Sequence, residues 1–122
     1  MRERLRALPL FADLDDEQLD RLATCTSEFE APAGQLLIER GDPGSGIFVL
    51  EHGGALVEAP EGEVKLGPGA VFGERSVLGH KERNARVRAQ TDVTCLAVAR
   101  TELARILDEN AAFAQRLRRL ST

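Results

Sequence analysis

Two side chains of opposite charge, Glu74 and Arg83, lie close together in the segment FGERSVLGHKERNARVRA, residues 72–89. Gly73 lets the backbone turn sharply, and the free N–H groups of a helical turn that follows it can bind an anion. Arg83 can bring a guanidinium group to the same anion, and bidentate arginine contacts suit a phosphate. An ionised carboxylate at Glu74 accepts hydrogen bonds from hydroxyl groups. Together they predict a ligand with a phosphate and a neighbouring hydroxyl, such as a ribose phosphate.

Short apolar segments separated by glycine-rich turns must position these residues. The turns lie at Gly34 and at the runs GDPGSG, HGG, PEG and GPG. The segments between them have the length of ordinary strands. They are QLLIE, IFVLE, ALVEA and EVKL, followed by ARVRA and VTCLAVA. This pattern predicts a mainly β fold, an antiparallel β-roll (a double-stranded β-helix, jelly-roll-like).

Helices are expected on both sides of the roll. Asp15 can cap an N-terminal helix and form a capping box with Gln18. Thr101 is the expected cap of the first of two C-terminal helices, which a bend at DEN, 108–110, separates. The predicted fold is therefore a β-roll with an N-terminal helix and two C-terminal helices.

The chain has the length of a single domain, since 122 residues suffice for one hydrophobic core. We expect one domain over residues 1–122. An N-terminal helical segment covers residues 1–30, and the β-roll covers residues 31–100. The phosphate-binding segment lies within the roll at residues 70–86, and the C-terminal helices cover residues 101–122.

Composition argues against several classes of protein. A net charge of -4 disfavours a protein that coats nucleic acid. The apolar runs are far shorter than the roughly 20 residues of a membrane helix, and no secretory signal opens the chain, so we expect no membrane contact and a cytoplasmic location. Cys25 and Cys95 are expected to be buried thiols. With only His52 and His80, we expect no metal site and no enzyme activity.

The segment LGPGAVFGERSVLGHKERNARVRA resembles the phosphate-binding cassette of the cyclic nucleotide-binding domain family, which includes the catabolite activator protein and the protein kinase A regulatory subunit. The family pattern is F-G-E, a short helix, and then R-x-A. The similarity extends to LPLFADLDDEQLDRLA, to APAGQLLIERGDPGSGIFVLEHGG and to the helices after Thr101. The ligand-binding residues that the resemblance implies are Phe72, Gly73, Glu74, Arg75, Ser76, Arg83, Asn84 and Ala85.

The resemblance also implies roles for these residues. Glu74 would bind the ribose 2′-hydroxyl and Arg83 the exocyclic oxygens of the cyclic phosphate, while neighbouring backbone groups complete the cradle. Asn84 stands where the family commonly has Ala, Ser or Thr, at a position that helps to distinguish cAMP from cGMP. A lid over the base would come from the last helix, at Leu117 or Leu120, although a buried stripe there equally fits plain core.

The resemblance implies a regulatory sensor domain that binds cAMP in preference to cGMP and transmits binding through its C-terminal helices. It implies no cofactor beyond this ligand, and its partners would be a second copy or a fused or separate effector domain. The family's transcription factors carry a helix-turn-helix after this domain, and because nothing after Thr122 can supply one, we expect no direct DNA binding by this chain. The alternative is a β-roll interaction or dimerisation module that no longer binds nucleotide. Arg86 and Arg88 are expected on the outward face of a strand.

Overall fold

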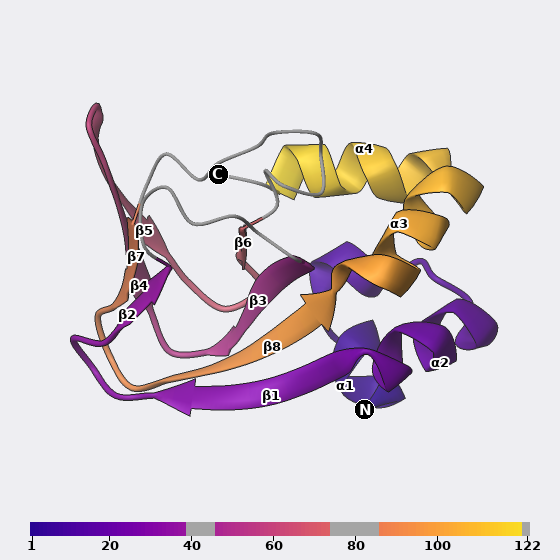
Figure 1. The fold of residues 1–122 in the computed structure, drawn as a ribbon, viewed down its shortest axis with the longest axis horizontal. Helices are drawn as coiled ribbons and strands as arrows, with labels where there is room; N and C mark the ends of the chain where they lie inside the picture. Colours follow the sequence, from indigo (N-terminus) through magenta and orange to yellow (C-terminus); the bar gives the residue numbers. More distant parts are fainter. Residues whose placement is uncertain (39–45, 74–85, 121–122) are drawn as a thin grey trace.

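The computed structural model describes residues 1–38, 46–73 and 86–120 (Figure 1). Within these residues, two antiparallel four-stranded sheets form a β-roll with helices before and after it. The elements are α1 (Arg2–Arg6), η1 (Pro9–Phe11), α2 (Asp16–Thr24), β1 (Thr26–Ala31), β2 (Leu36–Ile38), β3 (Gly46–His52), β4 (Ala55–Ala59), β5 (Gly62–Leu66), β6 (Val71–Phe72), β7 (Arg86–Ala89), β8 (Val93–Ala99), α3 (Arg100–Glu109) and α4 (Ala111–Leu120). The predicted fold class is confirmed.

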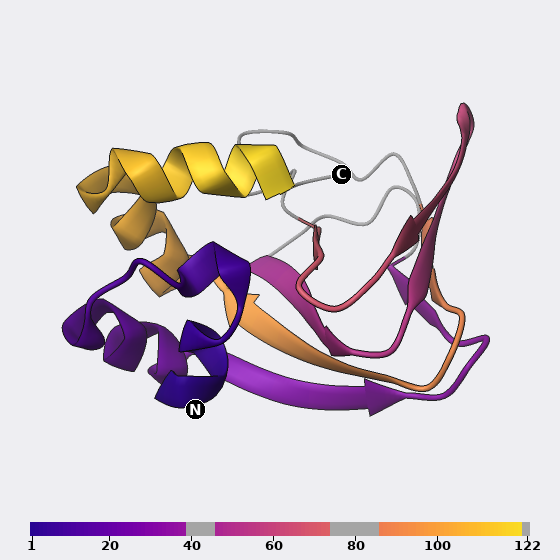
Figure 2. The same cartoon turned by 180° about the vertical axis from the view of Figure 1, so that it is seen from behind.

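Sheet A has the strand order β1-β8-β3-β6, and sheet B has the order β2-β7-β4-β5. Strand β8 is central in sheet A: it pairs with β1 from Thr26↔Val98 to Ala31↔Val93 and with β3 on its other side. The helices gather at one end of the molecule, and the strands of sheet B lie at the other (Figures 1 and 2). Because α3 follows β8 without a loop, the C-terminal helices are attached directly to the centre of sheet A.

The N-terminal helix α2 begins as the sequence predicts. The Asp15 carboxylate accepts a hydrogen bond from the Gln18 backbone N–H at 2.8 Å, and the Gln18 side chain accepts one from the Asp15 N–H at 3.2 Å. Leu19 and Leu22, on one face of the helix, are fully buried. The predicted capping box is therefore confirmed.

Three local features differ from the sequence-based expectations. Strand β1 begins at Thr26, inside the segment expected to be helical, because its residues pair along their whole length with β8. Helix α3 begins at Arg100 with Ala99 as its N-cap, so Thr101 lies within the helix and does not cap it. Strand β6, only two residues long, was not predicted. The expected bend is confirmed at Asn110, whose side chain accepts a hydrogen bond from the Phe113 N–H at 3.1 Å.

Sheet A separates two hydrophobic clusters. One of its faces packs against the helices, and we call this cluster the helical core; it includes Val71, Leu96 and Val98. Side chains of the other face join those of sheet B inside the roll, and we call this second cluster the roll core; it includes Phe72 and Cys95. Alternate residues of one strand therefore contribute to different cores, as the two-residue period of a strand requires.

Candidate functional site

The described residues include both ends of the predicted phosphate-binding cassette. Phe72 and Gly73 lie at the edge of sheet A, at the end of β6, and Arg86 opens β7 in sheet B. Most of the predicted ligand contacts lie outside the described residues; these are Glu74, Arg75, Ser76, Arg83, Asn84 and Ala85. The two ends of the cassette therefore lie on different sheets, and Phe72 and Val87 at these ends both belong to the roll core.

An aromatic cluster holds the first end of the cassette. Phe72 is 1% exposed, and its ring stacks on Phe48 of β3 with centroids 5.3 Å apart. Phe29 of β1 meets Phe48 edge-on at 5.6 Å. Such ring pairs add to the stabilisation from burial. Because β6 is so short, we infer that this cluster fixes where the cassette begins.

Gly73 has a backbone φ of +81°, in the left-handed region that disfavours any residue with a Cβ atom. This conformation agrees with the sharp turn that the sequence predicts at the start of the cassette. The residue type at this position is therefore explained by the backbone alone, without any contact to a ligand.

At the second end of the cassette, inward and outward residues alternate along β7. Val87 and Ala89 are buried in the roll core, whereas Arg88 is partly exposed. The Arg88 guanidinium donates to the Gly34 carbonyl at 3.0 Å and lies 3.4 Å from the Glu58 carboxylate. Arg88 is thus outward and bound within the protein, as expected. Arg86, two residues earlier in β7, occupies the equivalent outward position and lies opposite Glu58 in β4.

The inner wall of the roll offers apolar surface near both ends of the cassette. Several side chains there are packed on the roll core but only partly buried: Leu37, Phe48, Val57 and Ala70. Partly exposed apolar groups of this kind can pack against the face of a base. The sequence analysis did not single out Phe48, although its place in the alternating segment IFVLE could have indicated an inward ring.

The two lid candidates lie on α4. Leu117 is fully buried in the helical core. Phe113, one turn earlier, stacks on Phe11 with centroids 6.1 Å apart. Leu117 therefore packs as core in this structure. Leu120 is the last residue of α4, and its side chain lies outside the described residues.

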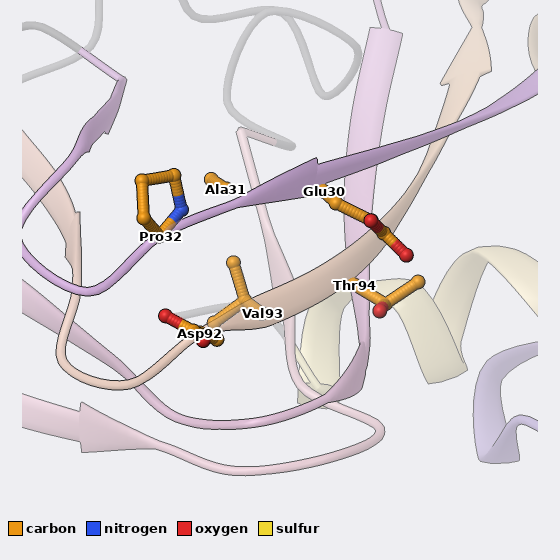
Figure 3. Close-up of a pocket in the computed structure, with 6 residues that line it drawn as sticks. All are labelled: Glu30, Ala31, Pro32, Asp92, Val93 and Thr94. Carbon is orange, nitrogen blue, oxygen red and sulfur yellow. The ribbon is translucent and has the colours of Figure 1, made fainter.

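A separate hollow lies between β1 and β8, lined by Glu30, Ala31, Pro32, Asp92, Val93 and Thr94 (Figure 3). It occupies the β1 side of sheet A, whereas the cassette begins at the opposite edge, on β6. The carboxylates of Glu30 and Asp92 would repel a phosphate. This hollow therefore does not suit the predicted ligand.

Within the described ranges, no group of three or more His, Cys, Asp or Glu residues could hold a metal ion. Cys95 is buried, as predicted, and burial raises the pKa of its thiol to about 11; Cys25 is only partly buried. No helix in the described part of the chain is both long and apolar enough to cross a membrane.

The architecture is that of a β-roll domain with terminal helices, in which the strands that flank the predicted cassette, β6 and β7, lie in different sheets. The profile of the family described as "Cyclic nucleotide-binding domain" matches residues 28–110. This chain belongs to the cyclic nucleotide-binding domain family.

Two curated relatives contain a similar sequence within much longer proteins. An uncharacterized NTE family protein of Mycobacterium tuberculosis is 40% identical over 93 residues, which make up 75% of this chain and 16% of that protein. The cAMP-dependent protein kinase regulatory subunit of Emericella nidulans is 35% identical over 106 residues, 84% of this chain and 26% of that protein. The chain therefore spans a minor part of each relative.

Solved structures agree with the fold. The catabolite activator protein of Thermus thermophilus has a TM-score of 0.73 and 29% identity, covering 92% of this chain and 55% of that chain. The regulatory subunit of a cAMP-independent protein kinase A from Trypanosoma brucei has a TM-score of 0.81 and 24% identity, covering 96% of this chain and 45% of that chain. The second likeness concerns the fold alone.

Proposed function

We propose that this domain binds a cyclic nucleotide, with cAMP favoured over cGMP, and acts as a regulatory sensor. The observation that carries the proposal is the cassette sequence itself: Phe72, Gly73 and Glu74, followed nine residues later by Arg83, inside the segment that matches the family. Glu74 binds the ribose 2′-hydroxyl, and Arg83 binds the cyclic phosphate. Backbone N–H groups at the start of the cassette complete the anion site.

The preference for cAMP rests on family likeness. One curated relative is named as a cAMP-dependent kinase subunit, and 84% of this chain aligns with it. Asn84 follows the phosphate-binding arginine, and we propose that its side chain contributes to the choice of base. Calorimetric titration with cAMP and then with cGMP measures the preference directly. Tighter binding of cGMP would contradict it.

Transmission of the signal depends on how the C-terminal helices are held. In this structure an ion pair between Arg116 and Asp13 connects α4 to the N-terminal segment. A second ion pair, between Arg21 of α2 and Glu109 of α3 at 2.6 Å, connects α3 to the same segment. A ligand that binds one arrangement of these helices more tightly than another shifts the population between them. We propose that the helices are the output, read by a second copy or by an effector domain, and that the protein acts in the cytoplasm without contacting DNA.

Thermal unfolding with and without nucleotide tests ligand binding. A single-site ligand at one hundred times its dissociation constant stabilises the folded state by about 2.7 kcal/mol. Arg83→Ala should abolish this stabilisation, and Glu74→Ala should reduce it. Arg88→Ala is the matched control, because Arg88 lies outward on the next strand and contacts Glu58 and Gly34. Equal stabilisation of the parent and Arg83→Ala would contradict the assigned role of Arg83.

The second candidate is a β-roll interaction module that binds no cyclic nucleotide. The fold also occurs in the regulatory subunit of a protein kinase A described as cAMP-independent, so the fold alone does not establish a response to cAMP. Absence of any thermal shift with both cAMP and cGMP, in a folded parent protein, would select it.

A further inference from the structure

The sheet edges of the described residues differ in their suitability for pairing with a second copy. Strands β6 and β2 are edges of only two and three residues. Strand β1 is longer, but pairing it with its own copy about Phe29 would set Glu28 opposite Glu30 of the second copy. Like charges directly opposite are unfavourable and are one way in which proteins protect an edge. These three edges are therefore poor surfaces for self-association.

Strand β5 is different, because its sequence GEVKL is complementary to itself in the antiparallel direction. With the twofold axis at Val64, Glu63 lies opposite Lys65 of the second copy, and Lys65 lies opposite Glu63 of the second copy. Residues directly opposite each other point to the same face of a sheet, so each pair can form an ion pair. The interface would be isologous, as a closed dimer requires.

The backbone of β5 is available for this register. Within the described residues β5 pairs only with β4, and the two-residue connection between Ala59 and Gly62 makes that pair the first of the ladder. A two-residue hairpin closes on a hydrogen-bonded pair, and such pairs alternate along an antiparallel ladder. Gly62, Val64 and Leu66 therefore direct their N–H and C=O groups towards β4. Those of Glu63 and Lys65 point to the free edge, where the two copies can exchange four hydrogen bonds.

The side chains give a second reason for this register. Val64 is 52% exposed, and it and Met1 are the exposed large hydrophobic residues among those described. Its partner in β4 is Val57, so the dimer would form a continuous apolar row through both copies. On the other face, Glu63 lies directly opposite Glu58 within the hairpin. Arg88 already contacts Glu58, and Lys65 of the second copy would place a second cation beside the two carboxylates.

The β4–β5 hairpin also projects away from the rest of the molecule (Figure 1). We propose that β5 is a homodimerisation edge, through which two copies join their four-stranded sheets into one continuous sheet of twice the width. The interface is small beside the roughly 1,200 to 2,000 Å² of a stable complex, so the dimer is weak and forms at high protein concentration. The proposal does not depend on nucleotide binding.

Sedimentation equilibrium of the nucleotide-free protein, from micromolar to millimolar concentration, tests the proposal. The parent should show a concentration-dependent dimer. Lys65→Glu and Glu63→Lys each replace both attractive pairs with repulsive ones and should weaken dimerisation at least about tenfold. The double variant Glu63→Lys with Lys65→Glu restores both pairs in reverse and should dimerise like the parent. A monomeric parent, an unchanged single variant, or a double variant that stays as weak as the single ones would overturn the proposal.

Cross-linking adds a readout that does not depend on the affinity of the dimer. Cα atoms of a non-hydrogen-bonded antiparallel pair are about 4.5 Å apart, which is within the range that a disulfide spans. Val64→Cys should therefore form a covalent dimer on mild oxidation to a much greater extent than the parent, whose own thiols are the partly buried Cys25 and the buried Cys95. Adding Lys65→Glu to Val64→Cys should suppress the cross-link. Cross-linking that this addition leaves unaltered would show that random collision, and not the proposed register, joins the chains.

Discussion

The turn at the start of the cassette should affect both the stability of the domain and its binding of ligand. Replacing Gly73 with alanine separates these two effects. The φ of +81° at this residue costs a residue with a Cβ atom about 1 to 2 kcal/mol. The lower entropy of the unfolded alanine variant offsets about 0.4 to 1 kcal/mol of this cost. A net loss of about 1 kcal/mol lowers the melting temperature of a domain of this size by roughly 3 to 6 °C.

Gly34→Ala provides a matched control for the backbone penalty. Gly34 has a φ of +92°, and a Cβ atom added there would meet no atom within 4 Å. It lies in the turn between β1 and β2 and not at the end of β6. The two variants should therefore lose similar stability in the absence of ligand.

The ligand response should distinguish the two variants. Thermal unfolding would be measured with and without whichever of cAMP and cGMP stabilises the parent. Gly34→Ala should keep the ligand-induced shift, whereas Gly73→Ala should lose most of it because the cassette begins in a different direction. If Gly73→Ala keeps the full shift, the turn at Gly73 does not position the cassette. If it melts at the parent temperature without ligand, a left-handed backbone at Gly73 is refuted.

Two further predictions concern a partly buried ion pair and a buried thiol. The Arg4 guanidinium donates hydrogen bonds to the Glu51 carboxylate at 2.9 and 2.5 Å and holds the pKa of Glu51 below its ordinary value of 4.5. The ion pair therefore stabilises the fold above that pH and is lost as the pH falls through the lower folded-state pKa. Glu51→Gln should cost about 1 kcal/mol near neutral pH, with the difference from the parent closing in urea titrations as the pH falls below 4.5; a constant difference would contradict the assignment. Burial raises the pKa of Cys95 to about 11, so at pH 8 its thiol should resist iodoacetamide in the folded protein and react once urea unfolds it, as mass spectrometry can show. Labelling of Cys95 in the folded protein would contradict its burial.

The elements that the sequence predicted well are those determined by neighbouring residues. The capping box depends on Asp15 and Gln18, three positions apart, and the bend depends on Asn110 and Phe113, also three apart. Strand β1 was not predicted, because its glutamates have little strand propensity and it becomes a strand through its pairing with the distant β8. Thr101 was expected to cap α3, but β8 continues straight into that helix and begins it earlier.

The candidate site was predictable to the extent that its residues lie together in the sequence. The motif located Phe72 and Gly73, and the structure adds the buried ring and the left-handed backbone. The ring that supports Phe72 comes from Phe48, in a strand more than twenty residues earlier, and no local spacing could have joined them. For Leu117 the local spacing was not enough, since the same helical spacing fits both a core residue and a lid residue.

Sheet A determines how the domain should melt. Val71 contributes to the helical core and the adjacent Phe72 to the roll core, so a single layer of strands is a wall of both interiors. A loss of packing in either core must disturb the other, because the strands of sheet A contribute to both. The domain should therefore unfold in one cooperative step. A cavity made in the helical core should therefore also displace the strands of sheet A on the roll-core side, where the cassette begins.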